Sequence, residues 1–434
     1  MGRSIVVAFL VTVGSEFGGD MAKTRDLDKR DQARAAVTAR LYADGWTQKE
    51  ISELLKVSQT AISRTYIEYA IEHAWLQDTL TFFEKEVPED ILAWAFNEWL
   101  AFPELENKVH ALGPKGITCN VRVVQGKGDA FFRGAGLHIA DLLKPSMLAG
   151  LLWGRTLWNC VNTQRQLLSP THKPNAFSVI PLCGDPHYLA QQEMVTFSSS
   201  NLARMLEKTL TGTLRKDAPN LVGLPAYVPR KPEKAERHEV LKYLHHTRGY
   251  ARIFHGNKKN PALINNVDTI LTGLGVVGNG DGSFTGTFLR ERCIQEGISL
   301  EQIAKLVYGD LGGVLIARPG LTRKENQIVE DMQTGWIGVT RKHFEACAKR
   351  VANKHYPGVI VVAYSTNRVE LICEVVRLGL VNELIIDHPL ACALDEFLPK
   401  NDSSERISVS KRGDRSSKKG TANKRTTKRK RRAQ

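Results

Sequence analysis

The hydrophobic positions in the first part of the chain repeat with the period of an α-helix. Over residues 28–44 they lie on one face of a predicted helix, formed by Ala33, Ala36, Val37, Leu41 and Tyr42. Gly45 is expected to end this helix. Thr47 is placed to cap the next one, because Glu50 follows at the spacing of a capping box. The inward face of this second helix is predicted to carry Ile51, Leu54 and Leu55.

A third helix is predicted after the short turn "KVS". Ser58 is expected to cap it, and its buried side is predicted to comprise Ile62, Tyr66, Ile67 and Ala70. Three helices with a tight turn between the last two are typical of a helix-turn-helix. In such a unit the last helix enters the major groove with its N-terminal residues against base edges. The candidate DNA-contacting residues are therefore Ser58, Gln59, Thr60, Ser63 and Arg64.

The chemistry of these polar residues suits DNA. Glutamine can pair with adenine, arginine with guanine, and serine or threonine with bases or phosphates. The alternative interpretation is a structural helical hairpin whose polar positions are simply solvated. The capping box, the turn and the polar face together favour DNA binding.

The chain between this unit and residue 117 has a weaker pattern. Residues 76–88 lose the helical period and are interpreted as part of a linker. Residues 91–112 regain it. This predicted helix carries aromatic side chains that we expect to pack internally or to form a dimer contact, namely Trp94, Phe96 and Trp99.

From residue 117 onward, predicted strands alternate with predicted helices. Strands are expected in "ITCNVRVV", "MLAGLLWG", "NAFSVIPLCG", "VDTILTGLG", "VIVVAYS" and "VNELIIDH". Helices are expected in "GAGLHIADLL", "RTLWNCVNTQRQLL", "SSSNLARMLEKTL" and "NRVELICEVVRLGL". This alternation predicts a doubly wound α/β fold with a parallel sheet. Ligands of such folds bind at the carboxyl ends of the strands, beside helix N-termini.

The first candidate ligand loop at such a strand end is Gly154-Arg155-Thr156. Gly154 allows a tight turn, and the helix that follows offers free N–H groups and a dipole that attract anions. Arg155 can add positive charge and Thr156 a hydroxyl. The alternative is a capped turn with a surface arginine, and the residues alone favour neither interpretation.

Three further candidates lie later in the chain. Gly273, Gly275 and Gly278 match the GxGxxG pattern, but no helix opens at the third glycine and the segment lies late in the domain. A dinucleotide site is therefore not expected, and this loop is interpreted as lying beside some other ligand or as a plain turn. Arg368 is predicted in the first turn of a helix, where it meets an anion or faces solvent. Asp310, in "YGDLGG", can accept sugar hydroxyls or cap a turn.

Composition limits the class of protein. The 434 residues are enough for two or more domains. Seven scattered cysteines without a CxxC pair fit unpaired thiols in a reducing compartment better than a disulfide framework or a zinc site. No GxSxG, HExxH or Walker sequence is present, so no catalytic residues, metal or cofactor are expected. His245 and His246 are expected on a solvated face.

The two ends of the chain differ from its body. The apolar segment "IVVAFLVTV" resembles a short signal-peptide core, but we expect residues 1–27 to be a disordered extension or a mis-called start, with the natural start at Met21 and export as the alternative. Residues 401–434 hold thirteen Lys and Arg against three Asp and Glu, so they carry +10 of the formal charge of +14. A disordered tail that contacts polyanions is expected, and a solubilising extension is the alternative.

Several segments, taken in order, resemble the SorC-type sugar-binding transcriptional regulators of bacteria, which share their layout with DeoR-type regulators. The resemblance extends from Gln32 to Phe397. It rests on "LYADGWTQKEISELLKVSQTAISRTYIEYA", "GLLWGRTL", "VIPLCG", "LVGLPAYVP", "VDTILTGLG" and "VVAYSTNRVELICEVVRLGLVNELIIDHPLACAL".

The resemblance implies an effector domain of the sugar-isomerase/CoA-transferase-like type that has lost catalysis and binds a phosphorylated sugar. It also implies a homo-oligomer, a dimer or tetramer, on operator DNA. This chain departs from the family in having Tyr364 and Ser365 where glycines are usual, and Arg368 where a lysine is usual. By motif position the implied effector site comprises Gly154, Arg155, Thr156, Ser199, Asn201, Gly273, Gly275 and Arg368, to which Asp310 is added as a candidate.

The predicted organisation has five parts. They are an extension (1–27), a helix-turn-helix domain (28–76), a linker with a connecting helix (77–116), an α/β effector domain (117–398) and a basic tail (399–434). The predicted function is that of a cytoplasmic, nucleoid-associated transcriptional regulator that senses a phosphorylated sugar and has no membrane partner. The alternatives are a sugar-phosphate isomerase or lactonase-like enzyme, and a constitutive DNA-binding protein with a non-functional pocket.

Overall fold

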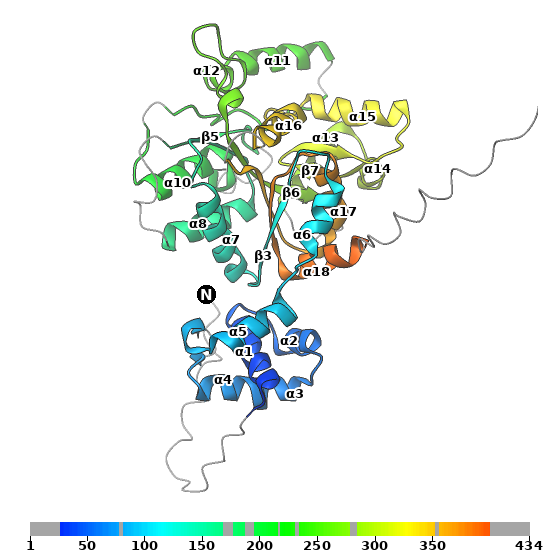
Figure 1. The fold of residues 1–434 in the computed structure, drawn as a ribbon. Helices are drawn as coiled ribbons and strands as arrows, with labels where there is room; N and C mark the ends of the chain where they lie inside the picture. The colour runs from blue at the N-terminus through cyan, green and yellow to red at the C-terminus, as the bar shows by residue number, and fades with distance from the viewer. Residues whose placement is uncertain are drawn as a thin grey trace, which may run out of the picture.

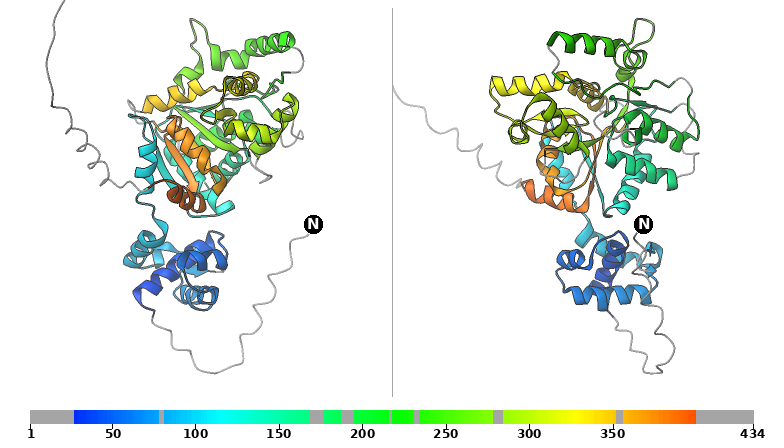
Figure 2. Two further views of the ribbon diagram at one scale, coloured as in Figure 1. Left: turned by 90° about the vertical axis from the view of Figure 1, so that its right-hand side faces the viewer. Right: turned by 180° about the vertical axis from the view of Figure 1, so that it is seen from behind.

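The computed structural model forms a helical lobe followed by an α/β lobe, as the sequence predicts (Figures 1 and 2). It describes residues 27–77, 81–167, 177–186, 195–215, 218–230, 234–277, 284–351 and 356–399. The expectations for the N-terminal extension before residue 27, for Gly278 and for the basic tail after residue 399 lie outside these residues.

The helical lobe begins with the three predicted helices. Its last helix starts as α3, passes through a π-helical turn and ends as α4. Thr47 and Glu50 form the predicted capping box, and the Ser58 hydroxyl accepts the Ala61 N–H at 3.1 Å. Both predicted caps are therefore confirmed. The bounds are α1 (Lys29–Ala43), α2 (Gln48–Leu55), α3 (Gln59–Ala61), the π-helical turn (Ile62–Ile67) and α4 (Glu68–Glu72).

The first part of the predicted linker is instead folded onto these helices. Its elements are β1 (Leu76–Gln77) paired antiparallel with β2 (Thr81–Phe82), a 3-10 turn (Glu84–Glu86), α5 (Glu89–Ala95) and a π-helical turn (Phe96–Leu100). Leu76, Ile91 and Leu100 are buried in one hydrophobic core with Leu41 of α1. Trp99 packs against this core, which agrees with the predicted packing role, whereas nothing is described for the side chains of Trp94 and Phe96.

The helix predicted over 91–112 is interrupted at residues 101–104, where the chain passes from one lobe to the other. Helix α6 (Leu105–Leu112) packs on the α/β lobe, because Leu105 and Val109 belong to the core of that lobe. The Lys108 ammonium also donates to the Asp395 carboxylate at 2.7 Å. The predicted connecting helix is thus two elements that belong to different lobes.

The α/β lobe contains the predicted parallel sheet, with strand order β3-β10-β9-β6-β4-β5. Neighbouring strands on this path run parallel throughout. The bounds are β3 (Asn120–Val124), β4 (Leu148–Leu151), β5 (Ser178–Pro181), β6 (Thr269–Val276), β9 (Gly358–Ala363) and β10 (Glu383–Asp387). All six strands predicted from the sequence are present.

Helices cover both faces of this sheet, as a doubly wound fold requires. Along β9, Val359 and Val361 belong to one core and Ile360 and Val362 to the other, which explains why the strands are apolar at every position. One face is covered by α7 (Asp129–Leu142), α8 (Arg155–Leu167) and α10 (Ser199–Thr211). The other is covered by α6, α16 (Arg341–Arg350), α17 (Val369–Arg377) and α18 (His388–Phe397).

The part between α10 and β9 is richer than predicted. Strands β7 (Val307–Leu311) and β8 (Val314–Ala317) form a hairpin that extends the sheet antiparallel to β6. A small core lies between this hairpin and α13 (Phe284–Glu296), α14 (Leu300–Leu306) and α15 (Arg323–Thr334). The remaining elements are α11 (Lys234–His246), α12 (Arg248–Tyr250), a π-helical turn (Ala251–His255) and 3-10 turns at Leu263–Asn266 and Thr366–Arg368.

Two other expectations concern single residue types. His245 is half-buried and stacks on Tyr250 with ring centroids 4.7 Å apart, so only His246 lies on the predicted solvated face. All seven cysteines are free thiols, as predicted. Among the described residues, no helix is long and apolar enough to cross a membrane, and no group of three or more His, Cys, Asp or Glu side chains is arranged to hold a metal ion.

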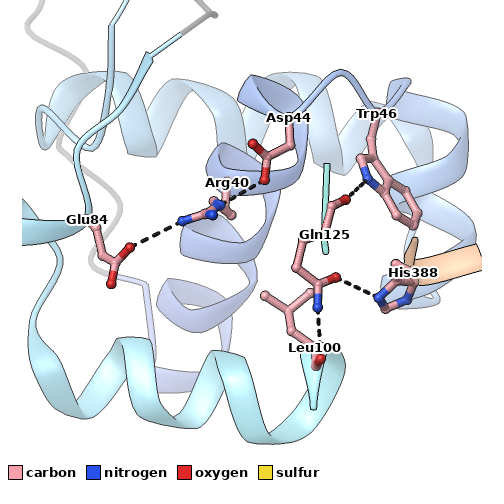
Figure 3. Close-up of polar contacts among 7 residues, drawn as sticks. All are labelled: Arg40, Asp44, Trp46, Glu84, Leu100, Gln125 and His388. Carbon is pink, nitrogen blue, oxygen red and sulfur yellow. Dashed lines mark hydrogen bonds and ion pairs between the residues drawn. The ribbon is translucent and has the colours of Figure 1, made fainter. Parts of the chain in front are cut away.

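The two lobes meet at a small set of polar contacts (Figure 3). The Trp46 indole donates to the Gln125 main-chain oxygen at 2.7 Å, and the Gln125 side-chain amide donates to the Leu100 carbonyl at 3.0 Å. The Gln125 side-chain oxygen accepts from His388 Nδ1 at 2.7 Å. Lys127 lies over the Trp46 ring, and its ammonium donates to Glu50 at 2.5 Å. We call Trp46, Gln125, Lys127 and His388 the interdomain hub.

Acidification should weaken the structure through His388. Burial, assisted by the charge of Lys127, lowers the pKa of His388 from 6.5 to about 4. The buried Nε2 has no hydrogen-bond partner among the described residues, so a proton there has no acceptor. The pKa of His388 is lower in the folded state than in the unfolded state, so the folded state is penalised when His388 takes up a proton. The free energy of unfolding is therefore at its full value above pH 6.5 and decreases as the pH falls towards 4, by at most about 3 kcal/mol.

The measurement is urea unfolding between about pH 7.5 and about pH 5. Wild type is expected to lose stability over this range more steeply than His388→Gln, which cannot titrate. Equal pH dependence of the two proteins would contradict a neutral, buried His388.

Candidate functional site

The predicted DNA-contacting residues share one exposed region at the start of the third helix. Ser58, Gln59, Thr60 and Arg64 are exposed, and Ser63 is half-buried with its hydroxyl donating to the Thr60 carbonyl at 3.3 Å. The opposite side of this helix is anchored by the four predicted apolar residues, all of which are buried: Ile62, Tyr66, Ile67 and Ala70. The helix is therefore held from behind and presents its polar N-terminal side outward.

The predicted effector residues lie near the carboxyl edge of the parallel sheet. The chain runs from β4 outward to β5, and later from β6 through β9 to β10 in the opposite direction. The order of the strands therefore reverses between β4 and β6, and such a switch point is where open α/β sheets bind ligands. The register pairs Leu151 with Leu271, so the residues that follow each of them emerge side by side.

Gly154 and Arg155 form the predicted turn from β4 into α8. Gly154 has φ +138°, a backbone conformation that favours glycine, and an added Cβ would meet no atom within 4 Å. The turn thus requires glycine for its backbone conformation, and the position of the missing side chain is open space. Arg155 and Thr156 are half-buried in the first turn of α8, where helix N–H groups and the helix dipole favour an anion.

The serine run before α10 has structural partners. Ser198, and not Ser199, caps the helix by accepting the Asn201 N–H at 3.1 Å. The Ser199 hydroxyl is buried and donates to the Cys183 carbonyl at 2.5 Å. The Asn201 amide donates to the Thr196 carbonyl at 3.1 Å. Ser199 therefore ties α10 to the chain after β5.

Gly273 and Gly275 are strand residues, as the predicted strand "VDTILTGLG" requires, and do not form the loop proposed from the GxGxxG match. Both lie within β6, and Gly275 pairs with Asp310 of β7. Asp310 is completely buried, and one of its carboxylate oxygens accepts the Gly313 N–H at 2.6 Å. Burial raises the pKa of Asp310 to about 7, although the Gly313 bond and the charge of Arg292 oppose this. Of the two predicted roles of Asp310, the structure shows the turn cap.

Arg368 also differs from the expectation of a side chain that faces an anion or solvent. It is only 4% exposed, and its guanidinium donates to the Tyr364 carbonyl at 2.5 Å and to the Asn367 side chain at 2.9 Å. The guanidinium lies 5.3 Å from the centre of the Tyr364 ring. Tyr364 and Arg368 thus contact each other, and Arg368 stabilises the turn after β9.

Ser365 holds a strained position at the same turn, with φ +81° and ψ 134°. Such a conformation costs a residue with a side chain about 1–3 kcal/mol. Ser365→Gly should relieve this strain, but glycine also gains entropy in the unfolded state, which offsets part of the benefit. The net expectation is an increase of about 1 kcal/mol in the free energy of unfolding. Urea unfolding measures this, with Ser365→Ala as the control that keeps the strain. An equal stability of the glycine and alanine variants would contradict the strain.

Two groups at this edge were missed by sequence reasoning. Asp387 caps α18 through the Leu390 N–H at 3.3 Å and also accepts the Ser365 N–H, so it joins the ends of β9 and β10. The sequence "DHP" at the start of α18 carried a signal, because aspartate before proline is a common helix start. Trp153 and Trp336 stack 6.4 Å apart beyond β4, and neither carries a local signal for this pairing.

No family model matches the chain, and no curated protein matches it. Solved structures do. A DeoR family transcriptional regulator from Listeria monocytogenes is 16% identical with a TM-score of 0.47, covering 67% of this chain and 98% of its own. The full-length sorbitol operon regulator SorC from Klebsiella pneumoniae is 15% identical with a TM-score of 0.46, covering 84% and 99%. A probable sor operon regulator from Shigella flexneri is 18% identical with a TM-score of 0.45, covering 67% and 98%.

Proposed function

We propose that this protein is a DNA-binding transcriptional regulator whose α/β lobe binds a small phosphorylated metabolite and thereby changes operator binding. The observation that carries the proposal is the third helix of the helical lobe. It is capped by Ser58, buried along its apolar side and exposed at Gln59, Thr60 and Arg64. These exposed groups have the donors and acceptors that read bases in the major groove.

The α/β lobe supplies the proposed sensor. A half-buried arginine and a helix N-terminus meet at a strand end beside the switch point of the sheet, an arrangement that favours a phosphate or carboxylate. Gly154, Arg155 and Thr156 are the residues we propose for the anion. Ser199, Asp310 and Arg368 support the surrounding turns in this proposal and do not contact the effector. We further propose a cytoplasmic homo-oligomer without catalytic activity.

A thermal-shift experiment tests the sensor. Phosphorylated sugars and their unphosphorylated counterparts are screened for an increase in melting temperature, because a ligand that binds only the folded state at about 100 times its Kd adds about 2.7 kcal/mol of stability. A phosphorylated sugar is expected to raise the melting temperature of wild type, and Arg155→Ala is expected to abolish the rise.

The matched control is Arg165→Ala, which removes an exposed arginine from the other end of the same helix and should leave the shift unchanged. A shift that survives Arg155→Ala, or one that unphosphorylated sugars produce equally well, would contradict a phosphate site at the start of α8. Turnover of a shifting compound would favour the enzyme alternative.

A further inference from the structure

The interdomain hub lies one residue beyond the carboxyl edge of the sheet. Strands β3 and β10 pair Val124 with Asp387, so Gln125 and His388 are the next residues of each strand, and their side chains are bonded to each other at 2.7 Å. Asp387 in turn accepts the Ser365 N–H at the end of β9. Two hydrogen bonds, joined by the backbone between Asp387 and His388, therefore link the turn after β9 to the hub.

On the side of the helical lobe, the hub contacts the start of α2, the second of the three predicted helices. Trp46 lies in the turn between α1 and α2, and its indole donates to Gln125 across the lobe boundary. The Lys127 ammonium bonds Glu50, the residue that completes the capping box of α2, and the Lys127 N–H donates to the Asp44 carbonyl at 2.8 Å. Figure 3 shows Trp46 and His388 approaching Gln125 from different lobes. The hub thus holds the turn that sets the direction of α2 and of the third helix behind it.

The contacts described between the lobes are a few hydrogen bonds, one salt bridge and the ring contacts of Trp46. His388 also packs edge-on against Trp46 with ring centroids 5.2 Å apart, and Gln125 and Leu100 line a cavity of about 580 Å³ on the side of the helical lobe. Lobes that meet through a few polar bonds are expected to move relative to each other unless those bonds hold. We therefore expect a change of a few bonds at the hub to change the direction of α2 and of the third helix.

We propose that Gln125 and His388 are positioning residues that couple the carboxyl edge of the sheet to the helix-turn-helix, so that occupancy of the edge reorients the DNA-reading helix. This inference rests on the proposed function, because it assumes that the effector binds at that edge. It adds the route by which binding in one lobe is transmitted to the other.

The test measures the distance between the lobes by pulsed electron spin resonance in the full chain. Spin labels are placed at Glu53→Cys and Glu396→Cys, two exposed positions in different lobes, with Cys392→Ser to remove the one cysteine that is not buried. Wild type is expected to give one narrow distance distribution. Trp46→Phe, which removes the indole N–H together with part of the ring, and Gln125→Ala are each expected to widen it about twofold.

Two further variants keep the result interpretable. Trp99→Phe makes the same chemical change at a tryptophan of the helical lobe that takes part in none of the contacts described between the lobes, and should leave the distribution narrow. Lys127→Gln removes the salt bridge between Lys127 and Glu50. Because the Lys127 side chain is partly exposed, this substitution tests the hub without disturbing the packing of the hydrophobic core. If all three hub variants keep the wild-type distribution, the positioning role is wrong.

Glucose 6-phosphate and the other sugar phosphates of the thermal-shift panel then probe the coupling. A sugar phosphate that raises the melting temperature should shift the wild-type distance and shift it less in Gln125→Ala. One that binds but leaves the wild-type distance unchanged would overturn the coupling, while the sensor would stand. If no sugar phosphate binds, the proposed effector and the coupling to it both fail, and widening in the hub variants would support the positioning role alone.

Discussion

Gly309→Ala is expected to lower the free energy of unfolding by about 3–5 kcal/mol. Gly309 has φ +154°, and an added Cβ would lie 2.0 Å from the Gly275 carbonyl oxygen and 2.9 Å from a methyl of Leu371. The oxygen belongs to the backbone of β6 and cannot move without opening the β6–β7 ladder. The β7–β8 hairpin would have to shift away from the sheet, and Gly313 would lose its fit against the Trp336 ring.

Chemical unfolding of the variant against wild type measures this loss. Gly320→Ala is the matched control, because Gly320 also has positive φ, +78°, but an added Cβ would meet nothing within 4 Å. It should cost only the conformational strain, about 1 kcal/mol. A Gly309 variant no less stable than the Gly320 variant would show that the hairpin does not pack on β6 as described.

Arg64→Ala is expected to weaken specific DNA binding about 10- to 100-fold while leaving the fold intact. Arg64 is exposed on the third helix and does not belong to the hydrophobic core of the helical lobe. An arginine paired with a guanine contributes about 1–3 kcal/mol to discrimination between bases. Non-specific binding, to which basic residues elsewhere contribute, should fall much less.

Fluorescence anisotropy with a selected site and a scrambled duplex at fixed salt separates these effects. Arg323→Ala removes an exposed arginine of the α/β lobe and should change neither affinity. If Arg64→Ala weakens both duplexes equally, Arg64 contacts phosphate and not a base. If it weakens neither, the third helix is not the DNA-reading element.

The features that the sequence predicted are those with local causes. Thr47, Glu50 and Ser58 bond within three residues of themselves, so their caps follow from spacing alone. The apolar strands of the parallel sheet are also locally visible, because a strand buried on both faces is apolar at every position. The order of the helices and the parallel sheet could therefore be predicted from the pattern of capping and hydrophobic residues.

The features that were missed or wrong depend on distant parts of the chain. The hairpins β1–β2 and β7–β8 are short and are stabilised by partners that no local pattern reveals. Arg368 and Ser199 are polar residues at helix starts, and only the packed structure shows that they are buried and already bonded. Gln125 and His388 are 263 residues apart, so the hub cannot be recognised before the register of β3 and β10 is known.

We propose that one chain reads DNA with its third helix and senses a phosphorylated metabolite at the edge of its sheet. Selection from a random pool of double-stranded DNA tests this most directly. Wild type should enrich a discrete sequence, and its affinity for that sequence should change when the sugar phosphate identified by thermal shift is added. Arg64→Ala should fail to enrich the sequence, and Arg155→Ala should enrich it but lose the response. Failure of wild type to enrich any sequence would contradict DNA reading by this chain. Enrichment of the same sequence by Arg64→Ala, together with no response of wild type to any sugar phosphate, would contradict both the reading helix and the sensor.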